Sequence, residues 1–249
     1  MKLNTLIFSK NRACQLELLL RSLGNFHVSV LYFHDPKFKK GYQKVQKMYP
    51  KVNFIKENNF KSQLTKFVEN SEFILFLTDD SVAINPIDPN LPEFKEFKED
   101  ESVVSLSLSL STKVAGHKWE WAKFRGNYRF RMWGYPMSVD SCVFRSAGIL
   151  PVITGNKVTT PNFLETYLNL NIPSRPFMLC LKTPVIINNS VNQVQKDFPQ
   201  STIGPTPLEL EERFLSGVRL SLDDIKAKAV NAKTYRIKVP YEFENYESN

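Results

Sequence analysis

Short apolar runs alternate with segments of helical spacing along the first 110 residues. The runs typical of buried strands are Leu3–Phe8, Val28–Phe33, Val52–Ile55, Phe73–Leu77 and Val103–Leu110. The segments between them carry apolar side chains three or four positions apart, as in the leucine-rich stretch before Gly24. Continuous apolar strands separated by helices indicate a parallel sheet covered on both faces. We therefore predict an α/β fold with a mainly parallel central sheet flanked by helices, and with Phe73–Leu77 near its middle.

The second half of the chain shows a weaker pattern. Residues 113–140 predict a loop-rich stretch, and the last ten residues predict a polar tail. Helices are expected over Pro161–Asn169, Leu208–Ser216 and Leu222–Val230, and a short strand over Val185–Ile187. The sequence has no repeat or low-complexity linker, and 249 residues suit one α/β domain with elaborations. We expect a single domain, 1–249, with a regular half to about residue 110 and a loop-rich half from about residue 111.

Composition argues against several classes of protein. A content of 42% hydrophobic and 23% charged residues is ordinary for a globular protein, so overall disorder is not expected. Three cysteines without a C-x-x-C pair argue against a disulfide framework or a zinc cluster and fit a reducing compartment. The sequence lacks the long apolar region of a signal peptide and any run as long as a membrane span. We expect a cytoplasmic protein, with peripheral attachment to a membrane surface as an alternative.

The net charge of +8 comes from lysines scattered along the chain rather than from one basic run. This distribution indicates a compositional bias with a local basic pocket for a phosphate-rich ligand. Nucleic acid is an alternative partner that the distribution does not favour.

The strongest chemical signal is the segment Phe73–Ser81, which reads FILFLTDDS. Its apolar strand ends just before two acids, Asp79 and Asp80. In open α/β sheets, ligands bind at the carboxyl ends of the strands. Two acids at such a position can hold a hard divalent cation, Mn²⁺ or Mg²⁺, that bridges phosphate groups. An ordinary acidic turn is the structural alternative, because Asp also favours turns.

Two further signals follow the first and second predicted strands. The segment Phe8–Arg12, FSKNR, precedes a helix whose N-terminus attracts phosphate, and Lys10 and Arg12 add positive charge. The segment has no glycine, so it is neither a Walker A loop nor a G-x-G-x-x-G motif. Asp35, in FHDP, can accept hydrogen bonds from a ribose or a base edge. A plain capped helix and an Asp-Pro turn are the structural alternatives.

The order of these motifs resembles the nucleotide-sugar half of GT-A glycosyltransferases, especially family-2-like members. The resemblance covers about residues 3–110 and rests on TLIFSKNRACQLELLLRSL, the strand before Asp35, and FILFLTDD. It implies a Rossmann-like GT-A fold, a nucleotide-diphospho-sugar donor, and Mn²⁺ or Mg²⁺ as cofactor. By this resemblance, Asp79 and Asp80 occupy the position of the D-x-D metal motif. The segment TDDS departs from that pattern, so which of the two acids binds the metal directly stays open. The candidate donor-binding residues are Ser9, Lys10, Asn11, Arg12, Asp35, Lys61, Asp79 and Lys233.

The second half resembles the acceptor half of family-2-like proteins. The matching pieces are YPMSVDSCVFR (135–145), TPNFLE (160–165) and NNSVNQVQ (188–195). An inverting enzyme needs a carboxylate base that deprotonates the acceptor hydroxyl. Glu165, in the first turn of a predicted helix, and Asp140 are the candidate catalytic residues. An acid that complements the helix dipole is the structural alternative for Glu165, and Asp140 can instead orient sugar hydroxyls.

The resemblance implies an inverting glycosyltransferase that moves a sugar from a nucleotide-diphospho-sugar to a hydroxyl acceptor, a glycan or glycoconjugate. One alternative is a glycosyltransferase that acts on modified DNA. Another is a degenerate GT-A domain that serves as a non-catalytic binding module. Nucleotidyltransferases share the fold, but their usual Gly-rich first loop is absent from FSKNRA. Slow hydrolysis of a nucleotide-sugar would separate an enzyme from a binding module.

Overall fold

The computed structural model describes residues 2–111, 119–124, 127–132, 136–172, 177–194, 202–229 and 236–246. Its strands are β1 (Leu3–Lys10), β2 (Val28–Phe33), β3 (Asn53–Lys56), β4 (Phe73–Thr78), β5 (Ser81–Ala83), β6 (Val103–Ser111), β7 (Trp119–Phe124), β8 (Asn127–Met132), β9 (Cys142–Arg145), β10 (Phe177–Leu181), β11 (Ile186–Asn189), β12 (Val218–Leu220), β13 (Arg236–Ile237) and β14 (Phe243–Asn245). Its helices are α1 (Ala13–Leu23), α2 (Lys39–Met48), α3 (Phe60–Glu69), α4 (Pro92–Glu99), α5 (Ser146–Gly155), α6 (Pro161–Leu170), α7 (Pro207–Leu215) and α8 (Leu222–Ala229), with a short 3₁₀ helix η1 (Pro36–Phe38).

A nine-stranded sheet forms the centre of the fold, in the order β3-β2-β1-β4-β9-β6-β10-β8-β7. The first four strands in this order are parallel, and β6 is parallel to β10. Strand β9 runs antiparallel to both β4 and β6, and β8 and β7 extend the far edge in antiparallel pairs. The α/β prediction is confirmed, and β4 lies inside the sheet between β1 and β9. The antiparallel pairs come from strands of the second half of the chain.

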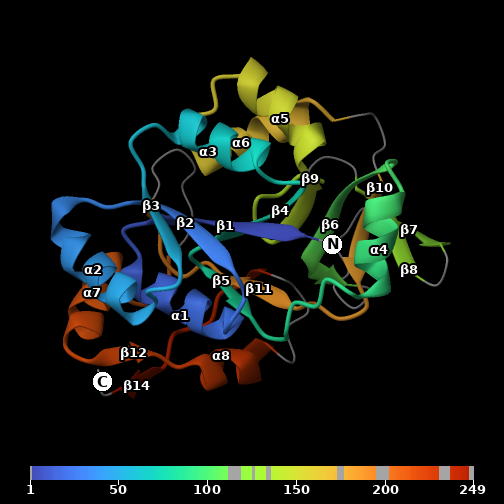
Figure 1. Ribbon diagram of the computed structural model, residues 1–249. Helices are drawn as coiled ribbons and strands as arrows, with labels where there is room; N and C mark the ends of the chain where they lie inside the picture. The colour runs from blue at the N-terminus through green and yellow to red at the C-terminus, as the bar shows by residue number, and fades with distance from the viewer. Residues whose placement is uncertain are drawn as a thin grey trace.

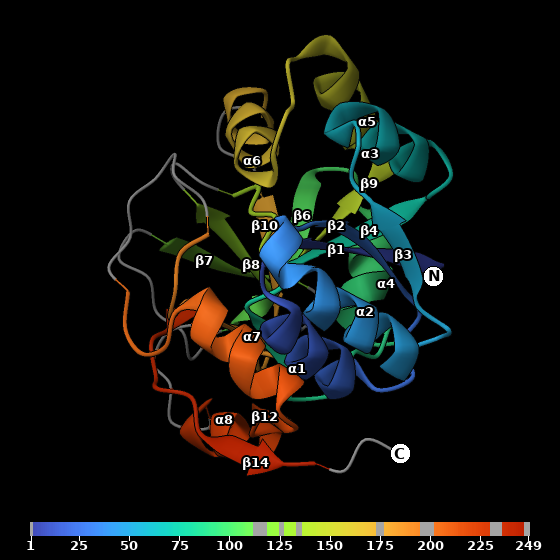
Figure 2. The same ribbon diagram turned by 90° about the vertical axis from the view of Figure 1, so that its left-hand side faces the viewer.

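Helices cover both faces of this sheet, with α3, α5 and α6 on one side and α1, α2 and α7 on the other, as the two views in Figure 1 and Figure 2 show. The fully apolar strand β4 explains this arrangement. Phe73, Leu75 and Leu77 enter the core shared with α1 and α2, whereas Ile74 and Phe76 enter the core shared with α3, α5 and α6. Successive strand residues point to opposite faces, so a strand buried on both sides must be apolar at every position.

Two predictions for the second half are wrong. The predicted loop over residues 113–140 contains β7 and β8, which pair as an antiparallel hairpin. The predicted polar tail contains β14, which pairs with β12. Glu244 of β14 accepts hydrogen bonds from Arg21 of α1 and Arg219 of β12. The polar segment of β14 therefore forms a strand because its pairing with β12, rather than a local hydrophobic period, stabilises it. The β8 segment, NYRFRM, does alternate apolar and polar residues, and the predicted loop overlooked this signal.

The parallel strands β3, β2, β1 and β4 end at one edge of the sheet, next to a smaller three-stranded sheet. Strand β5 begins directly after Asp80 and pairs with β11, which in turn pairs with β13. The register places Asn188 of β11 opposite Ser81 of β5. The smaller sheet therefore brings residues near 190 beside the acids at the end of β4. In the described part of the chain, helices long and apolar enough to cross a membrane are absent.

Helix α7 packs against α2 through a buried carboxyl group. Glu211 is 2% exposed, and its Oε1 accepts a hydrogen bond of 2.7 Å from the backbone N–H of Gly41. Among the described residues its Oε2 has no hydrogen-bond partner, and a Cβ at position 41 would clash with that atom. Burial raises the pKa of Glu211 from 4.5 to about 7, although the bond from Gly41 opposes the shift.

We predict that Glu211 makes the free energy of unfolding fall as pH rises. The folded pKa lies above the unfolded value, so the stabilisation is complete below about pH 4.5 and is lost as pH rises through about 7. Glu211→Gln should be more stable than the wild type at pH 8 and lose this advantage near pH 4.5, as measured by urea denaturation. Glu212→Gln, an exposed neighbour, is the matched control. Equal pH dependence in the wild type and Glu211→Gln would contradict the prediction.

Candidate functional site

A cleft of about 1360 Å³ opens at the carboxyl edge of the parallel strands. Both halves of the chain line it, from the β1–α1 segment to the start of α6 and the residues after β11. Most of the residues singled out from the sequence lie there, namely Ser9, Lys10, Asn11, Arg12, Asp35, Asp79, Asp80, Asp140 and Glu165. The structure thus gathers the predicted donor and acceptor residues around one cavity.

Asn11 joins the end of β1 to the end of β2. Its side-chain amide donates a 2.6 Å hydrogen bond to Oδ2 of Asp35, and its Oδ1 accepts one from the backbone N–H of Asp35. Asn11 has φ +55°, a left-handed conformation that Asn tolerates better than most residues. The reciprocal pair fixes the position of the Asp35 carboxylate at the rim of the cleft.

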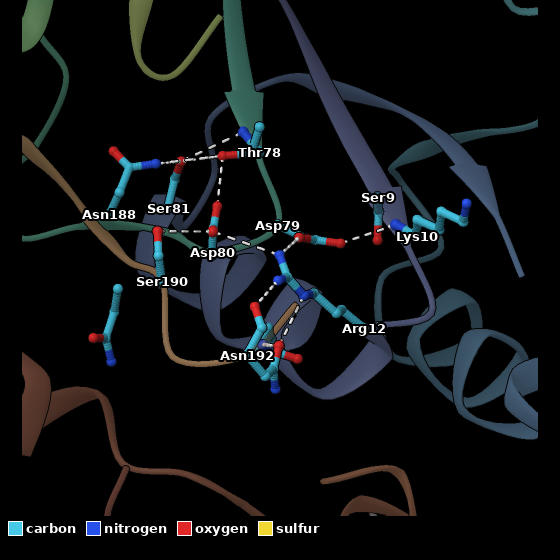
Figure 3. Close-up of polar contacts among 12 residues, drawn as sticks. Ser9, Lys10, Arg12, Thr78, Asp79, Asp80, Ser81, Asn188, Ser190 and Asn192 are labelled. Atoms are coloured by element: carbon cyan, nitrogen blue, oxygen red, sulfur yellow. Dashed lines mark hydrogen bonds and ion pairs between the residues drawn. The ribbon is translucent and has the colours of Figure 1, made fainter. Parts of the chain in front are cut away.

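Arg12 connects the first loop with the acids after β4 and with the segment after β11. Its guanidinium forms a 2.9 Å ion pair with Asp79, lies 3.5 Å from Asp80, and donates to both Oδ1 and the backbone oxygen of Asn192. Figure 3 shows these contacts reaching Arg12 from two segments, the acids after β4 and Asn192 after β11. Arg12 is 9% exposed, and its pKa is raised by Asp79 and Asp80 against the opposing effect of burial. The guanidinium therefore remains charged and holds the three segments together.

Asp79 accepts one hydrogen bond on each carboxylate oxygen. Its Oδ2 accepts from the backbone N–H of Lys10 at 2.9 Å, and its Oδ1 accepts from Arg12. The residue is 4% exposed, and burial raises the pKa of its carboxyl group while Arg12 opposes the shift. Little of the Asp79 carboxylate is therefore accessible to a ligand.

Asp80 has a different environment on the cleft side. Its Oδ1 lies 2.6 Å from the hydroxyl oxygen of Thr78, and its Oδ2 lies 3.2 Å from the hydroxyl oxygen of Ser190. The same Thr78 oxygen lies 3.2 Å from Oδ1 of Asp140. A hydroxyl carries one proton, so Thr78 can donate to only one of these two carboxylates at a time. Two carboxylates and a hydroxyl therefore face one another across a short distance.

Glu165 lies on α6 and lines the cleft from the second half of the chain. Its Oε2 accepts a 2.9 Å hydrogen bond from the backbone N–H of Val139, the residue before Asp140. The sequence placed Glu165 in the first helical turn, but α6 begins at Pro161, and the first turn contains no acid. The simple dipole explanation for Glu165 is therefore weakened, since the dipole acts mainly within the first turn. Glu165 instead fixes the segment that carries Asp140.

One candidate donor-binding lysine does not line the cleft, and another lies outside the described residues. Lys61 does not line it, and its ammonium group donates to the backbone oxygen of Thr154 at 2.8 Å, between α3 and α5. The structure therefore does not bring Lys61 to the donor residues, because its position on α3 directs it toward α5. Lys233 lies outside the described residues.

Sequence reasoning missed three polar partners of the acids. Thr78, Ser190 and Asn192 all line the cleft and contact the carboxylates or Arg12. The resemblance over NNSVNQVQ was the only signal for the last two. Hydroxyl and amide side chains are common on protein surfaces, so their type alone does not mark a site.

Comparison with known proteins supports the resemblance stated from the motifs. The chain is similar to the bifunctional glycosyltransferase pgtA of Dictyostelium discoideum, with 26% identity over 293 aligned positions. The alignment covers 92% of this chain and 36% of the relative, so the chain spans about a third of that protein's length. The resemblance to glycosyltransferases is thereby confirmed at the level of sequence similarity. Searches found no protein-family model that matches the chain.

Solved structures give more distant likenesses. A fragment of S. aureus TarS, 1–349, has 15% identity, covers 76% of this chain and 61% of that chain, and gives a TM-score of 0.46. The same fragment in complex with UDP-GlcNAc has 16% identity, covers 75% and 58%, and gives 0.44. A cytidylyltransferase from Leptospira borgpetersenii has 13% identity, covers 77% and 83%, and gives 0.42. These TM-scores are low, so the likenesses carry no argument about function.

We predict that Asp79 and Asp80 differ in their effect on stability. Asp79→Asn removes the buried partner of Arg12 and should lower the free energy of unfolding by about 3–5 kcal/mol, as for other buried ion pairs. Asp80→Asn keeps an acceptor for Thr78 and should cost about 1 kcal/mol or less. Chemical denaturation of both variants without ligand provides the measurement. Equal losses in the two variants would show that the neighbouring acids share one structural role.

Proposed function

We propose that the chain is a glycosyltransferase that moves a sugar from a nucleotide-diphospho-sugar to a hydroxyl acceptor with inversion at the anomeric carbon. The observation that carries the proposal is the convergence of Arg12, Asp80, Asp140 and Glu165 on one cleft at the carboxyl edge of the sheet. Ligands of open α/β sheets bind at this edge. The sequence similarity to a glycosyltransferase supports the choice of reaction class.

A divalent cation fits the chemistry of the oxygens around Thr78. Asp80, Asp140 and Thr78 offer hard oxygen atoms, the ligands that Mg²⁺ and Mn²⁺ prefer. The described residues contain no group of three or more Asp, Glu, His or Cys side chains that could hold a metal ion without further ligands. We therefore propose Asp80 as the direct protein ligand, with Asp140 beside it, and donor phosphates as completing ligands. When bound, the ion would neutralise charge on the diphosphate leaving group.

Asp79 is proposed as the ion-pair partner of Arg12 rather than as the direct metal ligand. Together Arg12, Asp79 and Asp80 carry one net negative charge, because Arg12 offsets one of the two carboxylates. Asp80, with Asp140 beside it, attracts a cation, but these protein oxygens are fewer than the octahedral coordination of Mg²⁺ needs, so the donor phosphates must supply others. The proposed metal affinity therefore depends on the anionic donor, which agrees with a cation that enters together with the nucleotide-sugar.

Glu165 is the proposed general base. Asp140 lies next to Thr78 and Asp80, on the side of the cleft proposed for the metal and the diphosphate. An inverting displacement needs its base on the acceptor side, opposite the leaving group. Glu165 comes from α6, and the hydrogen bond from Val139 orients its carboxyl group. It can therefore remove the proton of an acceptor hydroxyl while Asp140 contacts the donor side.

The donor site is tested with Asp80→Asn. The variant should bind a nucleotide-sugar about tenfold or more weakly than the wild type in the presence of Mn²⁺, because a charge-assisted contact is lost. Calorimetry with a panel that begins with UDP-GlcNAc, with and without Mn²⁺, measures the effect, and the donor that binds should also be hydrolysed slowly. Asp88→Asn, an exposed Asp, is the matched control. Metal-independent binding that Asp80→Asn leaves unchanged would refute the metal site.

The base is tested by replacing each carboxylate with its amide. Glu165→Gln should lower kcat by about 10²–10⁴ and leave donor affinity unchanged, because the amide keeps an acceptor for Val139 and loses only basicity. Asp140→Asn should instead weaken donor binding with Mn²⁺. Turnover assays with the donor found above, together with donor titrations, separate the two effects. Normal turnover by Glu165→Gln, an inactive Asp140→Asn with normal donor binding, or a product with retained configuration would contradict the mechanism.

A further inference from the structure

Three side chains form a row across the ends of β1, β2 and β3. Lys10 is in register with Phe33, and the pairing of Tyr32 with Lys56 brings the next residues, Phe33 and Glu57, side by side. The backbone N–H of Glu57 donates a 2.8 Å hydrogen bond to the oxygen of Tyr32, which extends the ladder to this point. Registered residues of parallel strands project from the same face, and all three line the cleft.

The centre of this row is an exposed aromatic ring. Phe33 is 37% exposed, although it belongs to a strand whose preceding residues are buried. The ammonium group of Lys10 lies 5.5 Å from the centre of its ring. Behind the ring, Phe8 and Leu31 belong to the buried core shared with α3, so the floor of this part of the cleft is apolar. An accessible ring on an apolar floor suits a flat ligand that stacks.

Glu57 closes one end of the row with a carboxyl group that lacks a fixed partner. It is half-buried, and its side chain forms no hydrogen bond or ion pair to the described residues. Burial raises the pKa of its carboxyl group, and the positive charge of Lys10 opposes that shift. Carboxylates that are partly removed from water and unpaired carry a desolvation cost, which a ligand's N–H group can offset.

We propose that Lys10, Phe33 and Glu57 form the nucleobase platform of the donor site, in which Phe33 stacks on the base and Glu57 accepts a hydrogen bond from its ring N–H. This inference rests on the proposed function, since it assigns the base of a nucleotide donor. Aromatic rings stack on every base and do not distinguish among them. Selection among the bases comes from Glu57, because an ionised carboxylate accepts hydrogen bonds and cannot donate them.

The chemistry of the bases then defines which donors fit. Uracil and guanine carry an N–H at the centre of the Watson–Crick edge, whereas cytosine and adenine carry an acceptor nitrogen there. A carboxylate aligned with this central position pairs with the first two bases and faces a lone pair in the other two. Asp35, whose Oδ2 is held by Asn11, also lines the cleft two residues after Phe33 and is left to contact the ribose. Among the ribonucleotides, the donor is therefore a uridine or guanosine diphosphate-sugar.

The experiment is a calorimetric titration of UDP, GDP, CDP and ADP into the wild type and Glu57→Gln. The wild type should bind UDP or GDP about tenfold more tightly than CDP and ADP, because the disfavoured bases leave Glu57 facing an acceptor. The tighter of UDP and GDP identifies the donor base. In Glu57→Gln the preference should largely disappear, since the amide can donate to cytosine or adenine. Phe33→Leu should weaken all bound nucleotides by a similar factor, because stacking is lost for each base.

Glu69→Gln, the same chemical change at an exposed position of α3, should leave the preference intact. Thermal unfolding of each variant checks that it is folded before titration. Nucleotide binding without a preference for UDP or GDP, or a preference that survives in Glu57→Gln, would overturn the platform while leaving the proposed transferase standing. Failure of the folded wild type to bind any nucleotide would overturn both.

Discussion

The buried ion pair between Arg12 and Asp79 is the interaction on which the rest of the site depends. It links the segment after β1 to the segment after β4, and through Asn192 it reaches a residue 180 positions away in the sequence. A buried guanidinium is costly unless every donor has a partner. The carboxylate of Asp79 and the oxygens of Asn192 supply those partners, and so they define the geometry of the cleft floor.

This ion pair also gives two neighbouring acids, Asp79 and Asp80, different roles. Asp79 is buried and accepts hydrogen bonds from Arg12 and from the backbone N–H of Lys10. Asp80 instead contacts the hydroxyl groups of Thr78 and Ser190. Consecutive residues at the end of a strand point in different directions, so adjacent carboxylates enter different environments. One acid stabilises the scaffold, and the other remains on the cleft side, where the proposed cation would bind.

Two groups of residues that the proposed transfer would use line the cleft. The ends of β1, β2 and β3 supply an aromatic ring and polar groups suited to a nucleotide, and α6 supplies Glu165 from the other half of the chain. The hydrogen bond from Val139 to Glu165 connects the two carboxylates of the second half. The in-line reaction proposed above would require the acceptor to approach from the side opposite the leaving group.

The sequence by itself determined the regular half of the fold and the edge where the site lies. Apolar runs such as Phe73–Leu77 are local signals, and a carboxylate that follows a buried strand must lie at the end of the sheet. Asp35, Asp79 and Asp80 could therefore be predicted as cleft residues. The strands β7 and β8 are neighbours in the sequence, and β8 alternates apolar and polar residues (NYRFRM), a local signal that the predicted loop overlooked. The strand β14 could not be predicted, since it depends on pairing with β12 from an earlier part of the chain.

Only the tertiary structure decided what each side chain contacts. Glu57 and Lys61 are four residues apart, yet Glu57 lines the cleft and Lys61 bonds to Thr154 on the other side of α3. The direction of each side chain depends on strand register and on the rotation of the helix that follows, and both are set by packing against distant elements. The pairing of Arg12 with Asn192 has the same origin. It depends on the position of β11 beside β5, which nothing in the local sequence around either residue specifies.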